Sequence, residues 1–579
     1  MSDHPSGHTW VPAAKPRSQP TRPPVKFHLP FPREPHPLLF FPQMPPTPKV
    51  NNNIFISTIQ FSDDLEKAVV RSARPYENPR SSASTLVSNT SYVNIYKPHP
   101  RQEHELLPPK RSSRIIRHLR YTLLTVYRRL FTLVFLLNTI PLTHVLNTHK
   151  INLDTLATCA STNLLIAILI RQDYTINTIF RTAWHTPWRL PLRARRWIAR
   201  CYCYGGIHSG AAVAGALWWS GFSAIMMIQF LRKGLHTVPI VAITLVITGL
   251  LGGIVVLAMP GPRKRWHNAF ELTHRLLGWA SVALFWLQLL LLTQHISTTT
   301  TNHPTTFTAA LLQTPTFYNL TLITLMLVYP WLSIRSWTFT PEVLSSHAMR
   351  LRFRKKIHRM SFLSISTSPW REWHPFAVFP NGMAGEGEMD ARGRDVCGDN
   401  SMIVSDAGDW THTLIQRARI LQQKYEASQQ RTHTQACSQY PQQTLTLYTR
   451  THPRAGVLSL TTLFPRVLIV TTGSGIGPSL SSLLHRPLHQ SIRLIWSTRS
   501  PLNTYGAAML ALVHQADPEA IIIDTDAVGR PDLVAVAWRE VQRIGAEAVF
   551  VLGNEAVTRR VVRGLEARGC PAFGPVWDS

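Results

Sequence analysis

The sequence has few cysteines and few acidic residues, and each shortage excludes a class of protein. Six cysteines in 579 residues are too few for a disulfide framework. Cys201 and Cys203 form one Cys-x-Cys, and no second pair completes a zinc site. The 31 acidic residues face 60 lysines and arginines, a net charge of +29. Residues 1–30 contain no long apolar run, so the sequence predicts no cleavable signal peptide.

The basic excess is of the size expected for a protein that binds nucleic acid or an anionic membrane. Position decides between them, because the lysines and arginines cluster beside long apolar runs. We therefore expect a lipid bilayer as partner and no nucleic acid. Residues 1–115 are rich in Pro, Ser, Asn, His and Arg, which predicts a disordered cytosolic tail.

Six apolar runs between residues 116 and 335 predict a six-helix transmembrane bundle. They are Tyr121–Leu142, Leu153–Ile170, Tyr204–Phe230, Val238–Met259, Leu272–Leu292 and Tyr318–Leu332. Most approach the ~20 residues that a helix needs to cross a bilayer; the second and sixth are short. Basic segments precede the first run and follow the second, fourth and sixth. The positive-inside rule then places both termini in the cytosol. The sequence does not distinguish the plasma membrane from an internal one.

The remaining chain divides into two patterns. Short alternating or β-branched segments separated by Pro and Gly predict an antiparallel barrel over 345–462. They are Met349–Phe353, Ser361–Ser366, Ser401–Ser405 and Thr444–Thr449. Two polar stretches, 381–399 and 421–443, are predicted to be inserted loops. Strand and helix patterns alternate over 463–579, which predicts an α/β doubly wound parallel sheet. Its strands are Val467–Thr471, Ile492–Trp496, Ala520–Asp524 and Ala548–Leu552.

A glycine turn follows the first strand of that sheet, where such sheets bind nucleotides. It consists of Thr472, Gly473, Ser474, Gly475, Ile476, Gly477 and Pro478. Gly473 and Gly475 allow a tight turn and a close approach to a pyrophosphate, and the following helix offers free N–H groups. The alternative is a strand and turn without a ligand. Arg499 ends the second strand without a neighbouring acid and suits a 2′-phosphate, which favours NADPH over NADH. The alternative there is a solvated arginine.

Two histidines in the membrane region are candidate metal ligands. His208 and His274 lie at the starts of the third and fifth runs, hence at one depth near the cytosolic face. Facing imidazoles on two helices can hold a six-coordinate haem iron. The alternatives are two interfacial histidines, or His267 as a ligand.

In the barrel segment, Trp373–Phe379 and Gly408–Thr411 stand out. An aromatic side chain can cover an isoalloxazine ring, while Gly and Thr leave room and hydrogen bonds for phosphate.

Six motifs in order make residues 115–579 resemble the ferric reductase/NADPH oxidase superfamily, and within it the fungal integral membrane protein TmpA group. The motifs are Arg265–Trp279, Arg371–Phe376, Val404–Thr411, Thr472–Pro478, Gly529–Asp532 and Pro571–Ser579. The resemblance implies a ferredoxin-NADP reductase-like module with an FAD barrel (345–462) and an NADPH domain (463–579). It further implies that a flavin is lined by His374, Pro375, Phe376, Gly408, Asp409, Trp410 and Thr411, with Trp577 stacked on it. Arg530 and Gly553 would belong to the nucleotide site.

The sequence departs from that superfamily in three places. A second haem would need histidines about fourteen residues further along, nearly four turns and about 21 Å away. Phe222 and Gln288 stand there, so we expect no outer haem. The Cys-Gly beside the nicotinamide is replaced by Leu552-Gly553, and residues 448–456 do not match the usual glycine link between barrel and nucleotide domain.

The leading hypothesis is a membrane flavo-oxidoreductase. It would pass electrons from NADPH through FAD to one b-type haem or to another, unidentified acceptor. One alternative is a transmembrane ferric reductase or superoxide-forming oxidase, which needs the missing outer haem. The other is a non-catalytic nucleotide-binding membrane scaffold or sensor, motivated by Leu552 and the missing histidines.

Overall fold

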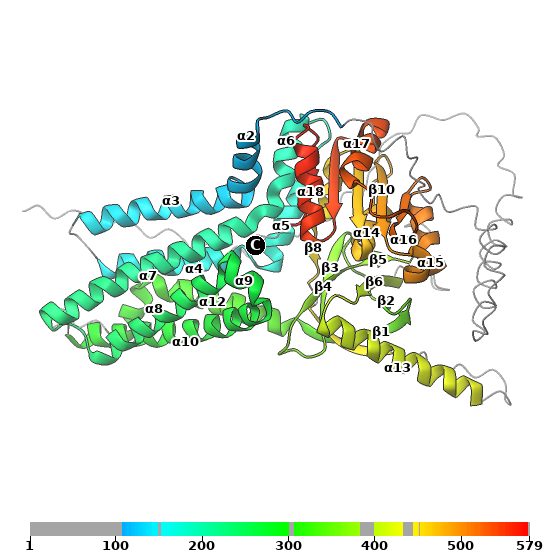
Figure 1. Cartoon of the computed structure of the whole chain (residues 1–579). Coiled ribbons are helices and arrows are strands. Elements are labelled where there is room, and N and C mark those ends of the chain that lie inside the picture. Colours follow the sequence, from blue (N-terminus) through cyan, green and yellow to red (C-terminus); the bar gives the residue numbers. More distant parts are fainter. Residues whose placement is uncertain are drawn as a thin grey trace, which may run out of the picture. The chain divides into compact units, whose positions relative to one another are not determined.

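Figure 1 shows the computed structural model of the chain, which describes residues 107–148, 152–299, 306–381, 399–431, 444–450 and 452–576. The chain divides into two compact units, Met1–Glu77 and Asn78–Ser579, and every described residue belongs to the second. The predicted tail lies outside the described residues as far as residue 106.

Each of the six predicted apolar runs forms a helix. The helices are α3 (Val126–Asn147), α4 (Leu153–Leu169), α7 (Gly205–Lys233), α8 (Val238–Ala258), α10 (His267–Thr299) and α12 (Pro315–Leu332). In the described part of the chain, four helical segments are long and apolar enough to cross a bilayer. The number reaches six if each of two bent pairs counts as one span. One pair is α4 with α5 (Asp173–Trp184), bent by 64°, and the other is α11 (Phe307–Gln313) with α12, bent by 76°.

The first helix begins later than the sequence predicted. Thr125 caps α3, because its hydroxyl accepts a hydrogen bond from the Arg128 backbone N–H at 3.3 Å. The preceding residues form α2 (Arg114–His118) and one π-helical turn, η1 (Leu119–Leu123). The apolar run that begins at Tyr121 therefore includes both the end of η1 and the start of α3.

The basic segment between α4 and α7 is folded and docks on the C-terminal half of the chain. It contains α5, α6 (Leu192–Ile198) and a 3₁₀ segment, η2 (Ala199–Tyr204). Ile176 and Phe180 of α5 are almost fully buried in a core that they share with the C-terminal parallel sheet. Buried Arg195 pairs with Glu547 at 2.7 Å and donates to the Leu463 carbonyl at 3.1 Å.

The predicted antiparallel barrel is present and nearly closed. Its strands are β1 (Ile334–Val343), β2 (Ala348–Arg354), β3 (Ser361–Ser366), β4 (His374–Ala377), β5 (Phe379–Pro380), β6 (Asp399–Ser405), β7 (Leu445–Arg450) and β8 (Arg454–Ala455). The order is β4-β3-β7-β1-β2-β6-β5, with β8 paired to β3. The barrel begins before residue 345, because β1 follows α12 after a single residue.

One predicted loop is wrong in part. Residues 421–431 continue α13 (Asp409–Arg431), while 432–443 lie outside the described residues. The apolar side chains of α13 lie in its first half, where Leu414, Ile415 and Ala418 are buried against the barrel. The polar second half was read as a loop because it has no apolar face. Most of the other predicted loop, 382–398, lies outside the described residues.

The C-terminal pattern folds as a five-stranded parallel sheet, in the order β11-β10-β9-β12-β13. The strands are β9 (Arg466–Thr472), β10 (Ser491–Thr498), β11 (Ile521–Asp524), β12 (Ala548–Leu552) and β13 (Ala572–Phe573). Val467 and Ile469 face one core, and Leu468 and Val470 face the other, so both faces are covered. The helices between the strands include α14 (Ile476–Leu484), α15 (Pro501–Ala516), α16 (Thr525–Val528), α17 (Leu533–Ile544) and α18 (Glu555–Glu566).

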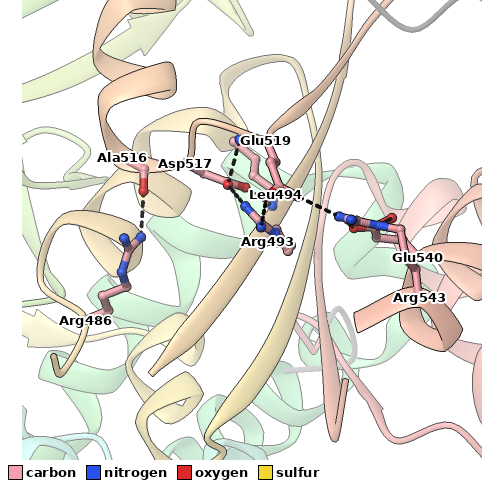
Figure 2. Close-up of polar contacts among 8 residues, drawn as sticks. All are labelled: Arg486, Arg493, Leu494, Ala516, Asp517, Glu519, Glu540 and Arg543. Atoms are coloured by element: carbon pink, nitrogen blue, oxygen red, sulfur yellow. Dashed lines mark hydrogen bonds and ion pairs between the residues drawn. The ribbon is translucent and has the colours of Figure 1, made fainter. Parts of the chain in front are cut away.

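Charged side chains near the start of β10 form a structural network, drawn in Figure 2. Buried Asp517 accepts hydrogen bonds from the Leu494 backbone N–H at 2.8 Å and from Arg493 at 2.5 Å. Arg493 also pairs with Glu519, which in turn pairs with Arg543 at 3.1 Å. These charges are satisfied among themselves at the end of the strands away from the glycine turn. That edge of the sheet therefore serves stability.

Candidate functional site

The glycine turn lies where β9 gives way to α14, at the carboxyl edge of the parallel sheet. Gly473 has a φ of +53°, a left-handed conformation that glycine adopts without strain. A Cβ on Gly475 would overlap the Thr471 hydroxyl and lie 3.3 Å from the Leu552 carbonyl. The turn is further fixed by the Trp496 indole, which donates to the Gly473 carbonyl at 3.0 Å. Helix α14 follows directly, but the Ile476 backbone N–H is already bonded to the Gly473 and Ser474 carbonyls and Pro478 has no N–H to offer an anion.

Gly553 brings the end of β12 to the same turn. A Cβ there would lie 2.7 Å from the Thr472 hydroxyl. Leu552, which stands where the superfamily pattern has cysteine, is mostly buried and ends β12. The two glycines thus leave a backbone-lined cradle at the centre of the sheet edge.

The end of β10 differs from the sequence interpretation. Arg499 is exposed directly after β10, and Arg530 is exposed after α16. Two acids that the sequence reading missed also lie here. Asp524 accepts from the Ser500 backbone N–H at 3.0 Å, and Asp526 accepts from the Ser500 hydroxyl at 2.8 Å. Parallel strand ends share one edge, so the position of Asp524 at the end of β11 could have predicted this neighbour.

The two barrel motifs meet in space. The His374 ring on β4 lies 4.3 Å from the Trp410 ring at the start of α13, at 30° between their planes. Phe376 lies 6.2 Å from the same indole. His374 Nε2 and Trp410 Nε1 are both buried without a hydrogen-bond partner among the described residues. Burial lowers the pKa of His374, partly offset by Glu372 and Glu271. Two buried, unpartnered ring nitrogens indicate a polar ligand at this point.

The other residues of the predicted flavin site are exposed, already hydrogen-bonded within the protein or outside the described residues. Pro375, Gly408 and Asp409 are exposed. The Thr411 hydroxyl accepts from the backbone N–H groups of Ala407 and Gly408 at 2.9 and 3.1 Å, and it donates to the Gly408 carbonyl at 2.9 Å. The hydrogen of the Thr411 hydroxyl is therefore already used in a hydrogen bond at the start of α13. Trp577 lies outside the described residues.

The barrel site and the glycine turn are adjacent. Helix α14 packs against β4 and β5. A Cβ on Gly477 would lie 3.7 Å from Ile403 and 4.0 Å from Phe379 of the barrel, an ordinary packing distance. The link between the two domains is Gly456, where a side chain would overlap the Phe362 ring. The sequence did not predict a glycine motif here. Glycine is required at 456 because the Phe362 ring occupies the space of a side chain, and Phe362 lies almost a hundred residues earlier in the chain.

A small cavity of about 190 Å³ lies between the barrel and the helices α4, α10 and α12. Arg171, Arg275, Arg450 and Arg454 line it, with Trp279, Trp331 and Trp373 among its other residues. Arg450 lies 4.7 Å above the Trp373 ring, directly before His374. These arginines were missed, since each is separated from the others by long stretches of sequence.

The predicted histidine pair comes together. The ring centres of His208 on α7 and His274 on α10 lie 6.3 Å apart at 69°. His208 Nδ1 donates to the Ala167 carbonyl of α4 at 2.8 Å, which leaves Nε2 as a free acceptor. His274 Nδ1 is buried without a partner among the described residues. His267, the alternative ligand, is exposed and lies 3.4 Å from Glu271.

The positions expected for an outer pair are filled by packed side chains. Phe222 is 2% exposed and stacks on Trp219 at 4.6 Å. Gln288 is also buried and donates to the Thr244 hydroxyl at 2.7 Å. The described residues contain no cluster of three or more His, Cys, Asp or Glu side chains that could hold a metal ion.

The barrel followed by a parallel sheet in this strand order is a ferredoxin-NADP reductase-like module. The sequence model of a family described as "Adenylate-forming reductase 03009, C-terminal domain" matches residues 457–579. Adenylate-forming reductases 03009 and 06235 of Coprinopsis cinerea are each 34% identical to this chain over 86% of its length. The chain spans 44% of the length of each of these relatives.

Solved structures also align with 42% of the chain, at low similarity. The CS-b5R domains of human Ncb5or, in the NAD⁺ form, align over 69% of that chain with 10% identity and a TM-score of 0.29. Ferredoxin-NADP⁺ reductase from Plasmodium falciparum with 2′P-AMP aligns over 94% of that chain with 9% identity and a TM-score of 0.26.

Proposed function

We propose that this chain is a multi-pass membrane flavo-oxidoreductase that moves electrons from NADPH through FAD to a single haem or to another acceptor. The observation that carries the proposal is the contact of α14 with β4 and β5. It sets the nucleotide cradle beside two buried ring nitrogens that lack partners, His374 Nε2 and Trp410 Nε1. The relatives named adenylate-forming reductases are consistent with a reductase, although the chain matches only part of each.

In this proposal the glycine turn binds the pyrophosphate of NADPH. Gly473 and Gly475 let the backbone approach it, and the positive end of the α14 dipole attracts its charge. Arg499 and Arg530 face the 2′-phosphate from the edge of the sheet. Asp524 does not oppose them strongly, because its carboxylate is held by the backbone N–H groups of Ser500 and Asp526, each at 3.0 Å.

His374, Pro375, Phe376 and Trp410 hold the flavin. FAD, when bound, accepts a hydride from the nicotinamide and releases its electrons one at a time. The aromatic rings exclude water from one side of that site, and the two unpartnered ring nitrogens supply hydrogen bonds. Arg450, which lies over the Trp373 ring directly before β4, places positive charge where the phosphates of a dinucleotide need it, while Arg454 is paired with Asp173.

His208 and His274 are the proposed ligands of one b-type haem, which carries a single electron when bound. Their 6.3 Å spacing suits two nitrogens that each lie about 2 Å from one metal atom. The bond from His208 Nδ1 to Ala167 fixes that ring with Nε2 available, the usual arrangement of a metal-ligating histidine.

A complete electron path across a bilayer is less well supported. Packed Phe222 and Gln288 occupy the outer positions, which speaks against a transmembrane ferric reductase or superoxide-forming oxidase. We still propose that the membrane helices are of the ferric reductase type, in the TmpA group, with both termini in the cytosol. The acceptor of the electrons is then haem or a molecule on the cytosolic side.

The test is an absorption spectrum of the full-length, detergent-purified protein before and after anaerobic addition of NADPH. We expect flavin bands that bleach and a haem Soret band that sharpens. Bleaching without a haem band would remove His208 and His274 as ligands and keep the flavoenzyme. Absence of both chromophores would overturn the proposal and favour the scaffold.

A pair of variants separates the ligands from their surroundings. His208→Ala should abolish the haem band and leave NADPH-dependent bleaching of the flavin. His267→Ala, its matched control, should retain both, because His267 is exposed near the same membrane face. A full haem band in His208→Ala would exclude His208 as a ligand.

A further inference from the structure

A second cavity, of about 510 Å³, lies between the start of α3 and helix α18. The α6–η2 segment and Gly574–Val576 complete its wall, and it shares no residue with the glycine turn or the His374–Trp410 pair. Seven arginines line it: Arg120, Arg129, Arg193, Arg196, Arg200, Arg559 and Arg563. Among the described residues of this wall, Glu566 is the one acid, and it pairs with Arg200. Arg559 pairs at 2.9 Å with Glu555, which lies outside the wall.

The wall is assembled from distant parts of the sequence, which Figure 1 shows as α3, α6 and α18. Tyr121 donates its hydroxyl hydrogen to the Glu566 carbonyl at 3.1 Å. The Arg111 backbone N–H donates to the Ala567 carbonyl at 2.9 Å, and Arg568 donates to the Pro108 carbonyl at 3.0 Å. The arginines are thus gathered by the tertiary fold.

Cations that line one cavity repel one another, and salt weakens that repulsion strongly only beyond a screening length of about 8–10 Å. A ligand with several negative charges relieves that repulsion. Guanidinium groups bind phosphate oxygens in pairs, so a wall of arginines selects phosphate over a single carboxylate. We propose that this cavity binds a phosphate-bearing anionic ligand.

Two apolar side chains on the same wall favour a phospholipid headgroup as the source of that phosphate. Trp197 is 80% exposed and Leu124 is 42% exposed. Exposed Leu119 and Leu123 of η1 continue the apolar surface beside the cavity. Tryptophan at the headgroup level and basic residues just inside a membrane helix are features of anionic-lipid sites. This source rests on the proposed membrane position of α3; the phosphate site does not.

The experiment measures binding to the full-length protein in detergent, by the change in tryptophan fluorescence. The probes are dioctanoyl phosphatidylinositol 4,5-bisphosphate, dioctanoyl phosphatidylcholine and soluble inositol 1,4,5-trisphosphate. We expect the bisphosphate lipid to bind and phosphatidylcholine not to bind. At least tenfold tighter binding of the lipid than of the trisphosphate assigns a lipid. Equal binding of both assigns a soluble phosphate to the same site.

The decisive variant is the triple substitution Arg129→Gln, Arg196→Gln and Arg563→Gln, expected to weaken binding at least tenfold. Its charge-matched control is Arg417→Gln, Arg419→Gln and Lys424→Gln on α13, away from the cavity, expected to stay within twofold. If the triple variant does not elute as a folded protein, Arg196→Gln alone replaces it, with an expected loss of at least threefold. Absence of binding by both phosphate probes, or equal binding by variant and control, would overturn the proposal.

Discussion

Gly475 shows how one missing side chain lets the glycine turn pack closely against the ends of β9 and β12. The Thr471 hydroxyl is buried without a partner among the described residues, and it lies where a Cβ on Gly475 would stand. The Leu552 carbonyl closes the other side at 3.3 Å. Neither neighbour is the end of a flexible side chain, so an added methyl group forces the backbone to move. The site and the local stability therefore depend on the same residue.

We expect Gly475→Ala to lower the free energy of unfolding by about 1–3 kcal/mol, the usual cost of overpacking. It should also reduce kcat/KM for NADPH at least tenfold, because the backbone of the turn that would hold the pyrophosphate is displaced. Thermal unfolding and NADPH oxidation with a dye acceptor measure the two effects. Gly249→Ala on α8 is the control, since nothing lies within 4 Å of its added Cβ. Unchanged kcat/KM in Gly475→Ala would contradict the proposed cradle.

His374 predicts a pH dependence of stability. Burial lowers its pKa in the folded protein below the unfolded value of about 6.5, so the unfolded chain binds the proton more readily. The stability that neutral, buried His374 contributes is fully present above about pH 6.5 and is lost as the pH falls below that value. We expect the Tm of the flavin-free protein to fall between pH 7 and pH 5, and the fall to be smaller in His374→Gln. An unchanged pH slope in the variant would exclude this origin.

Helix α5 shows that an element can serve two parts of the molecule at once. It leaves the end of α4 at a bend of 64° and buries Ile176 and Phe180 in the core beneath the nucleotide sheet. Its Asn177 donates to the Pro453 carbonyl and accepts from the Ala455 backbone N–H, both at 2.9 Å. The helix thereby connects the membrane segment with the junction of barrel and sheet.

We expect Asn177→Ala to destabilise the protein by about 1–3 kcal/mol, because two backbone groups near β8 lose their partner. Limited proteolysis should cut variant protein faster between the membrane helices and the barrel. Gln422→Ala on the exposed second half of α13 is the control and should behave as wild type. Equal proteolysis of Asn177→Ala and the control would show that the contact does not hold the two parts together.

At the scale of the whole molecule, the number of membrane crossings decides where the termini lie. Length and composition allow four to six crossings among the described helices, depending on the two bent pairs. The alternation of basic and neutral loops fits six crossings, since it repeats after every second apolar run.

Reporter tags test this arrangement in cells. Tags at residue 1 and after residue 579 should both be protected from externally added protease or label. A tag inserted between α10 and α11 should be accessible. Termini on opposite sides would mean an odd number of crossings and would contradict the six-helix prediction. A tag inserted between α13 and β7 offers a control for the cytosolic side.

Local patterns in the sequence predicted the elements well and their contacts only in part. The strand Val467–Thr471, its glycine turn and the six apolar helices follow from periodicity and turn chemistry, which act over a few residues. The second half of α13 was missed, because its polar residues carry no such periodicity. The capped start of α3 was misplaced, because the apolar run does not stop at Thr125.

The sequence by itself determined that this protein has apolar helices, a barrel and a parallel sheet with a glycine turn. Each of these features is predicted by the pattern of residues that are neighbours in the sequence. Only the tertiary structure brought His208 within 6.3 Å of His274, set Asp526 beside Ser500 and gathered seven arginines around one cavity. Such neighbours are separated by tens to hundreds of residues. The packing of helices and strands decides their distance, and no local pattern records it.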